Sequence, residues 1–123
     1  MSSPTEPTPA GPPVRRFKDP AYVEVAPTLG DLRARIDQLD EQIVSLLAQR
    51  ALCVRDATRF KRDAFQVSAP ARQAQVFERV KALAAPHEAQ FPGLSAIVES
   101  TYRTLVAGFI AGEGRFFHDS EPI

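Results

Sequence analysis

Apolar residues recur every three or four positions along most of the chain after residue 28. In the first such segment they are Leu29, Leu32, Ile36, Leu39, Ile43, Leu46, Leu47, Val54 and Ala57. These spacings are typical of one face of an α-helix. Thr28 and Asp31 have the spacing of a capping box, and neither proline nor glycine occurs from 31 to 69. The pattern predicts a first helix from about 29 to 63.

Two further helices are predicted downstream. Ser68 or Ala69 caps the second, Pro70 occupies its first turn, where its missing N–H costs nothing, and Pro86 ends it. Its apolar face comprises Val76, Phe77, Val80 and Leu83. The third helix follows the segment FPGL, and its apolar residues are Ile97, Val98, Tyr102, Leu105, Val106, Phe109, Ile110, Phe116 and Phe117. The predicted fold class is therefore an all-α, three-helix chain with one long N-terminal helix.

The length of the first helix predicts a partner chain. A helix of about 34 residues is about 50 Å long. A compact domain of about 95 residues has a radius of gyration of about 13 Å, so its diameter is well short of that length. We therefore expect an intertwined homodimer, in which a second copy covers the overhanging part of the helix.

Both ends of the chain lack helical periodicity. The prolines before the first helix are Pro4, Pro7, Pro9, Pro12, Pro13, Pro20 and Pro27. Such a segment cannot bury enough apolar surface to order itself, so residues 1–27 are predicted to form a flexible tail. The helical domain is expected over 28–118, and 119–123 are expected to form a short C-terminal tail.

Composition and charge exclude several classes of function. The formal net charge is zero, which argues against a nucleic-acid partner. The sequence has neither a signal-peptide core nor a stretch of about 20 apolar residues, so no membrane segment is expected. Cys53 is the single cysteine, which excludes an intrachain disulfide and favours the reducing cytoplasm. His87 and His118 lack companions at ligand spacing, so no metal site is expected.

Two cations interrupt the apolar stripe of the first helix. Arg50 and Lys61 fall on the apolar arc, about 20° apart in azimuth and about 16 Å apart along the axis. Burying two unpaired cations costs several kcal/mol, so internal carboxylates or a bound anion should neutralise them. In the alternative interpretation, Arg50 reaches past the helix edge into water and Lys61 simply ends the stripe.

Other polar residues are expected to border the same cavity as Arg50 and Lys61. Glu113, the carboxylate on the apolar stripe of the third helix, is a candidate site residue. In the alternative interpretation it forms only a structural ion pair with Arg50 or Lys61. Arg72 and Gln73 precede the apolar face of the second helix and border the cavity. Arg33 lies about 25 Å from Arg50 along the first helix, too far to share a small ligand. In an antiparallel dimer, however, Arg33 completes the site of the other chain.

The string LRARIDQLDEQIVSLLAQR, followed eleven residues later by the lysine of RFK, resembles the all-helical chorismate mutase family. The resemblance covers 29 to about 117 and implies an intertwined homodimer with two sites. It also implies a small dicarboxylate substrate, chorismate, which rearranges to prephenate in one unimolecular step. Such chemistry requires no nucleophile, metal or organic cofactor.

The resemblance assigns roles to the cationic residues. Arg33 matches the arginine that the neighbouring subunit donates to a substrate carboxylate, and Arg50 matches the carboxylate clamp within the subunit. Lys61 matches the cation that contacts a carboxylate and the ether oxygen of the breaking bond. Arg72 resembles a further arginine that contacts the anion.

Three positions depart from the family pattern. Gln73 stands where bacterial mutases have a glutamate that binds the substrate hydroxyl, and Ala69 stands where an aspartate is expected. Glu113 replaces the glutamine that is the second donor to the ether oxygen, a variant that some members share. Glu113 can donate there only as the protonated acid, because an ionised carboxylate only accepts hydrogen bonds.

Two alternatives remain open beside a mutase with Lys61, Glu113 and Arg50 as catalytic residues. The segments ATRFK and APAR also resemble the isochorismate pyruvate lyases of salicylate formation, a related branch of the fold. The lyases keep glutamine at the position of Glu113, which favours the mutase. A non-catalytic helical module that dimerises and regulates a partner enzyme is the second alternative.

Overall fold

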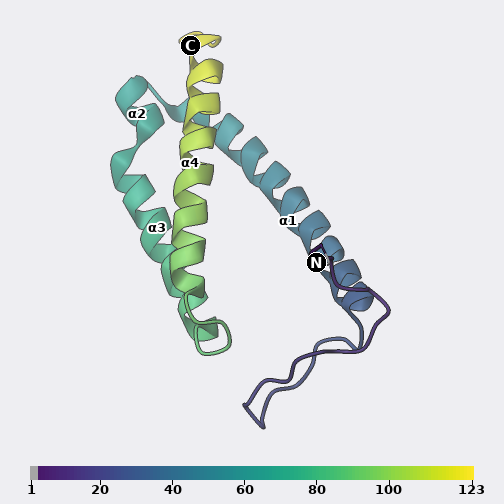
Figure 1. Ribbon diagram of the computed structural model, residues 1–123. Coiled ribbons are helices and arrows are strands. Elements are labelled where there is room, and N and C mark those ends of the chain that lie inside the picture. The colour runs from purple at the N-terminus through teal and green to yellow at the C-terminus, as the bar shows by residue number, and fades with distance from the viewer. Residues whose placement is uncertain (1–2) are drawn as a thin grey trace. The chain divides into compact units, whose positions relative to one another are not determined.

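The computed structural model describes residues 3–123, which contain helices and no strand (Figure 1). The α-helices are α1 (Leu29–Ala57), α2 (Ala64–Ser68), α3 (Pro70–Ala84) and α4 (Leu94–His118). Two 3₁₀ helices, η1 (Thr58–Phe60) and η2 (Ala85–His87), follow α1 and α3. The all-α fold class with three long helices is confirmed. The short helix α2 is an addition that the sequence pattern did not predict.

The first helix begins where predicted but ends earlier. Thr28 Oγ1 accepts a hydrogen bond of 3.1 Å from the backbone N–H of Asp31. The predicted end near 63 was wrong, because α1 stops at Ala57. The buried Thr58 donates its hydroxyl to the Val54 carbonyl at 3.3 Å, and the chain tightens into η1. The backbone of Lys61 is then extended, with φ −103° and ψ 134°.

A tight turn joins α2 to α3. Asp63 caps α2, its side chain accepting a hydrogen bond from the Gln66 N–H. Ala69 ends α2 in the left-handed conformation, with φ 46° and ψ 61°, and its N–H donates to the Phe65 carbonyl at 2.8 Å. Pro70 then occupies the first position of α3, as predicted, although Ala69 offers no side-chain cap.

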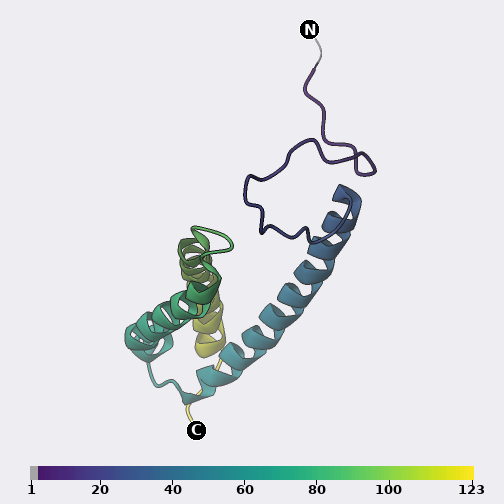
Figure 2. The same cartoon turned by 90° about the horizontal axis from the view of Figure 1, so that it is seen from below.

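Helices α3 and α4 pack side by side, as Figures 1 and 2 both show. The buried apolar side chains are Val67, Phe77, Val80, Ala84 and Val106, which come from α2, α3 and α4. Burying a valine or phenylalanine side chain stabilises the fold by about 1.5–3 kcal/mol. This small core holds α2, α3 and α4 together.

The carboxylate of Glu88 caps the start of α4. It accepts hydrogen bonds from the Gly93 N–H at 2.6 Å, the Ser95 N–H at 2.9 Å and the Ser95 hydroxyl at 2.9 Å. Gly93 has φ 94°, a left-handed conformation that favours glycine. The sequence reveals the glycine before the helix but gives no signal for a cap seven residues upstream of Ser95.

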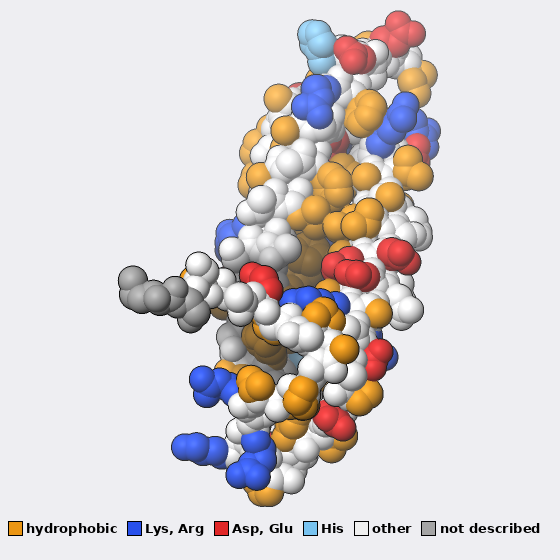
Figure 3. Space-filling view, turned by 45° about the vertical axis from the view of Figure 1, so that its right-hand side comes forward, with side chains coloured by type: hydrophobic (Ala, Val, Ile, Leu, Met, Phe, Trp, Pro, Cys, Tyr) orange, Lys and Arg blue, Asp and Glu red, His pale blue; other side chains and the backbone are white. Residues whose placement is uncertain are grey.

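The chain divides into two compact units, one ending at Ala48 and the other running from Gln49 to Ile123. The buried apolar side chains all belong to the second unit. In the first unit the apolar stripe of α1 lies open to solvent. Its residues Ile36, Leu39, Ile43 and Leu46 are 45–62% exposed. The space-filling view shows hydrophobic side chains on the surface among charged ones (Figure 3).

The described part of the N-terminal segment, 3–28, contains neither helix nor strand. The Pro9 carbonyl accepts a hydrogen bond of 3.1 Å from the Gly30 N–H, and the rings of Phe17 and Tyr22 meet edge to face at 4.7 Å. The predicted tail also includes residues 1 and 2, which lie outside the described residues. Within 3–123, no helix combines the length and hydropathy needed to cross a bilayer.

Candidate active site

A cavity of about 300 Å³ lies within the unit from Gln49 to Ile123. Its polar lining includes five of the six candidate residues, Arg50, Lys61, Arg72, Gln73 and Glu113. Its apolar lining includes Val54, Ala57, Val67, Val76, Val106 and Ile110. An apolar wall with a few convergent polar groups is typical of a small-molecule site, and the volume is of the usual order.

Arg50 occupies an apolar position of α1 because its guanidinium packs on aromatic rings of α4. Its Cζ lies 5.2 Å from the ring centroid of Phe109 and 5.9 Å from that of Tyr102. Such cation–π contacts contribute about 0.5–1 kcal/mol each at exposed sites. The side chain is half-buried, so it packs against α4 instead of extending freely into water.

Lys61 reaches the cavity by a different route from the one predicted. Its place on the helical arc was wrong, because α1 has already ended and Lys61 lies on the extended link before α2. Its Nζ donates a hydrogen bond of 3.0 Å to the Gln66 carbonyl and lies 3.5 Å from Glu113 Oε2. The ion pair that the alternative interpretation assigned to Glu113 therefore forms, with Lys61 as the cation.

Glu113 is the most buried charged side chain of the cavity, at 6% exposure. Its Oε2 atom forms the ion pair with Lys61 but accepts no hydrogen bond from the described residues. A buried polar atom without a hydrogen bond costs about 1–3 kcal/mol, and the ion pair offsets part of this cost. The structure thus presents a buried carboxyl oxygen that a ligand atom in the cavity can satisfy.

The cavity is electropositive. Its lining holds three cationic side chains, Arg50, Lys61 and Arg72, and one carboxyl group, Glu113. This cationic surplus favours an anionic ligand, because low-dielectric walls strengthen each charge interaction.

Gln73 is held by the turn between α2 and α3. Its Nε2 donates to the Ser68 carbonyl at 2.7 Å. A carbonyl oxygen only accepts, so the amide nitrogen must face Ser68, and Oε1 remains as a free acceptor. Gln73 therefore brings an uncharged acceptor to the cavity lining.

The family model described as chorismate mutase type II matches residues 32–114. The chain belongs to this chorismate mutase family. Comparison with curated proteins gives no match. The matched range contains all six candidate residues and every residue that lines the cavity.

In this chorismate mutase domain, the cavity lining differs from the predicted set at Arg33 and Cys53. Arg33 lies exposed on α1, in the unit that ends at Ala48, and does not line the cavity. Its role in a neighbouring chain stays a prediction. Cys53 lines the cavity and is exposed, although sequence reasoning gave it no place there. The sequence does indicate this place, because Cys53 follows Arg50 by three residues and so lies on the same helix face.

Proposed function

We propose that the chain catalyses the rearrangement of chorismate to prephenate. Membership of the chorismate mutase family supports this type of enzyme. The observation that carries the proposal is the convergence of Arg50, Lys61 and Arg72 on one cavity of about 300 Å³. Chorismate carries two carboxylates, so its negative charge suits this cationic lining.

Carboxylate binding selects the reactive conformer. The rearrangement is unimolecular, so the site must fold the substrate until the two reacting carbons meet. Arg50 clamps one carboxylate from within the subunit, Arg33 of a second copy clamps the other, and Arg72 adds a further contact. Guanidinium groups suit this role, because their planar fork matches a carboxylate.

Lys61 and Glu113 act at the ether oxygen of the breaking bond, where negative charge grows. Lys61 stabilises that charge, and removing one preorganised donor of this kind typically costs about 3–4 kcal/mol of barrier. The two side chains are 3.5 Å apart, so one ligand oxygen can contact both. Glu113 can donate there only as the protonated acid, because an ionised carboxylate only accepts hydrogen bonds.

The proposed functional unit is a homodimer. The apolar stripe of α1 is exposed in the single chain, and the helix, at 29 residues, is about 43 Å long. A second copy laid antiparallel against α1 buries this stripe and carries its own Arg33 toward the opposite site. Light scattering on the purified chain should give twice the monomer mass.

The isochorismate pyruvate lyase remains the second candidate. The segments that resemble the lyases are 57–61 and 69–72, and they supply Lys61 and Arg72 to the cavity. Glu113 favours the mutase. A third candidate is the non-catalytic dimerisation module, which the exposed stripe of α1 alone also fits.

One assay separates the three candidates. The purified chain is incubated with chorismate and, separately, with isochorismate, and the products are resolved by chromatography. The mutase forms prephenate from chorismate, whereas the lyase forms pyruvate and salicylate from isochorismate. A module without catalytic activity leaves both compounds unchanged. Prephenate is the expected product, and its absence would reject the proposal.

A further inference from the structure

A single residue, Gln66, fixes the link between η1 and α2 through three hydrogen bonds, which we call the Gln66 clip. Its backbone carbonyl accepts the hydrogen bond from Lys61 Nζ at 3.0 Å. Its side-chain Oε1 accepts from the Arg62 N–H at 2.6 Å, and its own N–H donates to Asp63 Oδ1 at 2.9 Å. Gln66 thus holds the backbone next to Lys61 with its side chain and the Lys61 ammonium with its carbonyl.

The Gln66 clip restricts the Lys61 side chain, which would otherwise be flexible. The lysine side chain carries about 2 kcal/mol of rotamer entropy, and it lacks the rigid fork of arginine. Here it also projects from an extended link and not from a helix, so neighbouring turns do not restrain its backbone. Glu113 attracts the ammonium at 3.5 Å, whereas the Gln66 carbonyl directs one of its three N–H groups.

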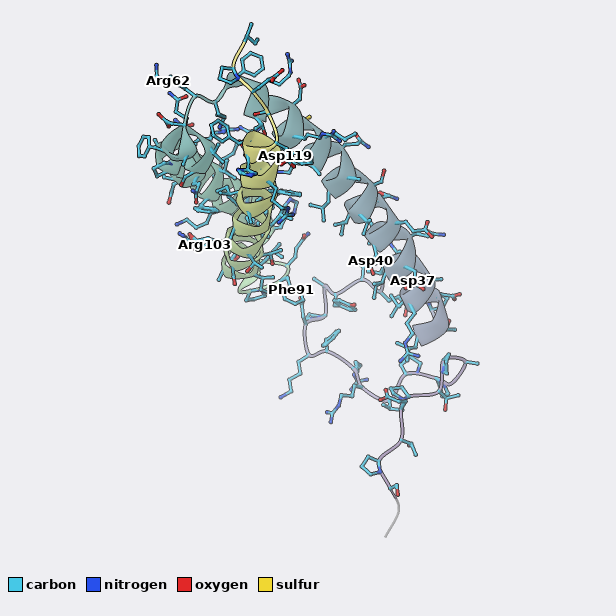
Figure 4. The ribbon with its side chains drawn as sticks, turned by 90° about the horizontal axis from the view of Figure 1, so that it is seen from above. Asp37, Asp40, Arg62, Phe91, Arg103 and Asp119 are labelled. Carbon is cyan, nitrogen blue, oxygen red and sulfur yellow. The ribbon has the colours of Figure 1, made fainter. Side chains whose placement is uncertain are left out.

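We propose that Gln66 is a positioning residue, which preorganises the Lys61 ammonium beside Glu113 by fixing the link between η1 and α2. This inference rests on the proposed mutase function, in which Lys61 contacts the reacting atoms. Gln66 itself does not line the cavity and acts through Lys61. Figure 4 labels Arg62 on this link; its backbone N–H, and not its guanidinium, forms the clip.

Two substitutions separate the clip from the bulk of the side chain. Gln66→Met keeps the length but has no strong acceptor for the Arg62 N–H. Gln66→Glu keeps an acceptor at the same distance along the side chain. Gln75→Met makes the same chemical change on the exposed face of α3, away from the cavity, and serves as the matched control.

The expected result is a selective loss of turnover. Gln66→Met should lower kcat by about 10- to 100-fold, because a misplacement of about 1 Å can cost about 100-fold in rate. KM should change less than kcat, because Lys61 acts on charge that develops in the transition state. Gln66→Glu should restore most of the lost kcat, and Gln75→Met should match the wild type.

A second readout does not depend on catalysis. Trace acetylation with acetic anhydride, mapped by peptide mass spectrometry, compares the reactivity of Lys61 with that of Lys81 in the same sample. Gln66→Met keeps the backbone carbonyl but loses the Oε1 hydrogen bond that fixes the link and so aligns this carbonyl with Lys61. The relative labelling of Lys61 should therefore rise several-fold, and Gln66→Glu should reverse the rise.

The outcomes distinguish the inference from the proposed function. Unchanged Lys61 labelling in Gln66→Met, or a loss of kcat that Gln66→Glu shares in full, would overturn the positioning role. A wild-type chain without mutase activity would reject the proposed function, while the labelling experiment alone would still decide whether Gln66 positions Lys61.

Discussion

The ammonium of Lys61 lies 3.5 Å from the buried carboxyl group of Glu113. The two residues come from different segments, the link after η1 and helix α4, and they meet at the wall of one cavity. This pairing places a fixed positive charge beside a group that can carry a proton. Each of these properties leads to a measurable expectation.

Replacement of Glu113 by glutamine should keep turnover. Only the protonated acid can donate to the ether oxygen, and the ionised form repels the negative charge that grows there. An amide always has an N–H to donate, so we expect the kcat of Glu113→Gln to equal or exceed that of the wild type. Steady-state rates of the two chains check this. A kcat of Glu113→Gln well below the wild-type value contradicts the role.

The proposed sharing of the site between subunits predicts complementation. Arg33→Ala and Arg50→Ala should each be inactive alone, because each removes one carboxylate clamp from both sites. After mixing and subunit exchange, random pairing gives about half mixed dimers with one complete site each, or about a quarter of wild-type activity. If Arg33 served its own chain, the mixture would stay inactive.

Ligand binding should protect Cys53 from alkylation. The thiol lines the cavity and is exposed, and as the single cysteine it reports without ambiguity. Saturating prephenate should slow the reaction of Cys53 with a maleimide, measured by mass spectrometry. Arg50→Ala, which lacks a clamp, should lose this protection. Equal rates with and without prephenate in the wild type would place the ligand elsewhere.

The cap at the start of α4 should make stability depend on pH. Hydrogen bonds from the Ser95 N–H, the Gly93 N–H and the Ser95 hydroxyl hold the pKa of Glu88 below its ordinary value of 4.5. A lowered folded-state pKa stabilises the fold above the unfolded pKa, and this contribution disappears as the pH falls through the folded value.

The wild type should therefore have a higher Tm than Glu88→Gln at neutral pH, and the difference should shrink below about pH 4.5. Thermal unfolding followed by circular dichroism at several pH values measures it. Glu121→Gln, outside the helices, is the control and should leave Tm unchanged. A constant difference between wild type and Glu88→Gln at all pH values would reject the cap as its source.

Helical periodicity predicted the three long helices because the apolar residues of each recur every three or four positions and so lie on one helix face. It failed at the end of α1, where no proline or glycine marks the stop. The stop comes from Thr58, whose hydroxyl turns back to the Val54 carbonyl, and from Asp63, which starts a new helix. The spacing of Asp63 and Gln66 is that of a capping box, and this signal was available in the sequence.

The candidate site was predicted more completely than the path of the chain that forms it. Lys61 was placed on a helical arc that does not exist, yet its ammonium meets Glu113, because a long side chain reaches the same cavity from the link. Spacing alone could not reveal the Gln66 carbonyl as its partner, because that contact depends on the turn into α2. Nor could it test Arg33, whose role depends on a second chain.

The most direct test is the rate of prephenate formation from chorismate by the wild type and by Arg50→Ala, with light scattering and circular dichroism on both. We expect turnover by the wild type and none by a folded, dimeric Arg50→Ala. The two cation–π contacts that Arg50 loses contribute only about 0.5–1 kcal/mol each, too little to unfold a domain. Absence of prephenate from the wild type, or wild-type kcat in the folded fraction of Arg50→Ala, would contradict the assignment.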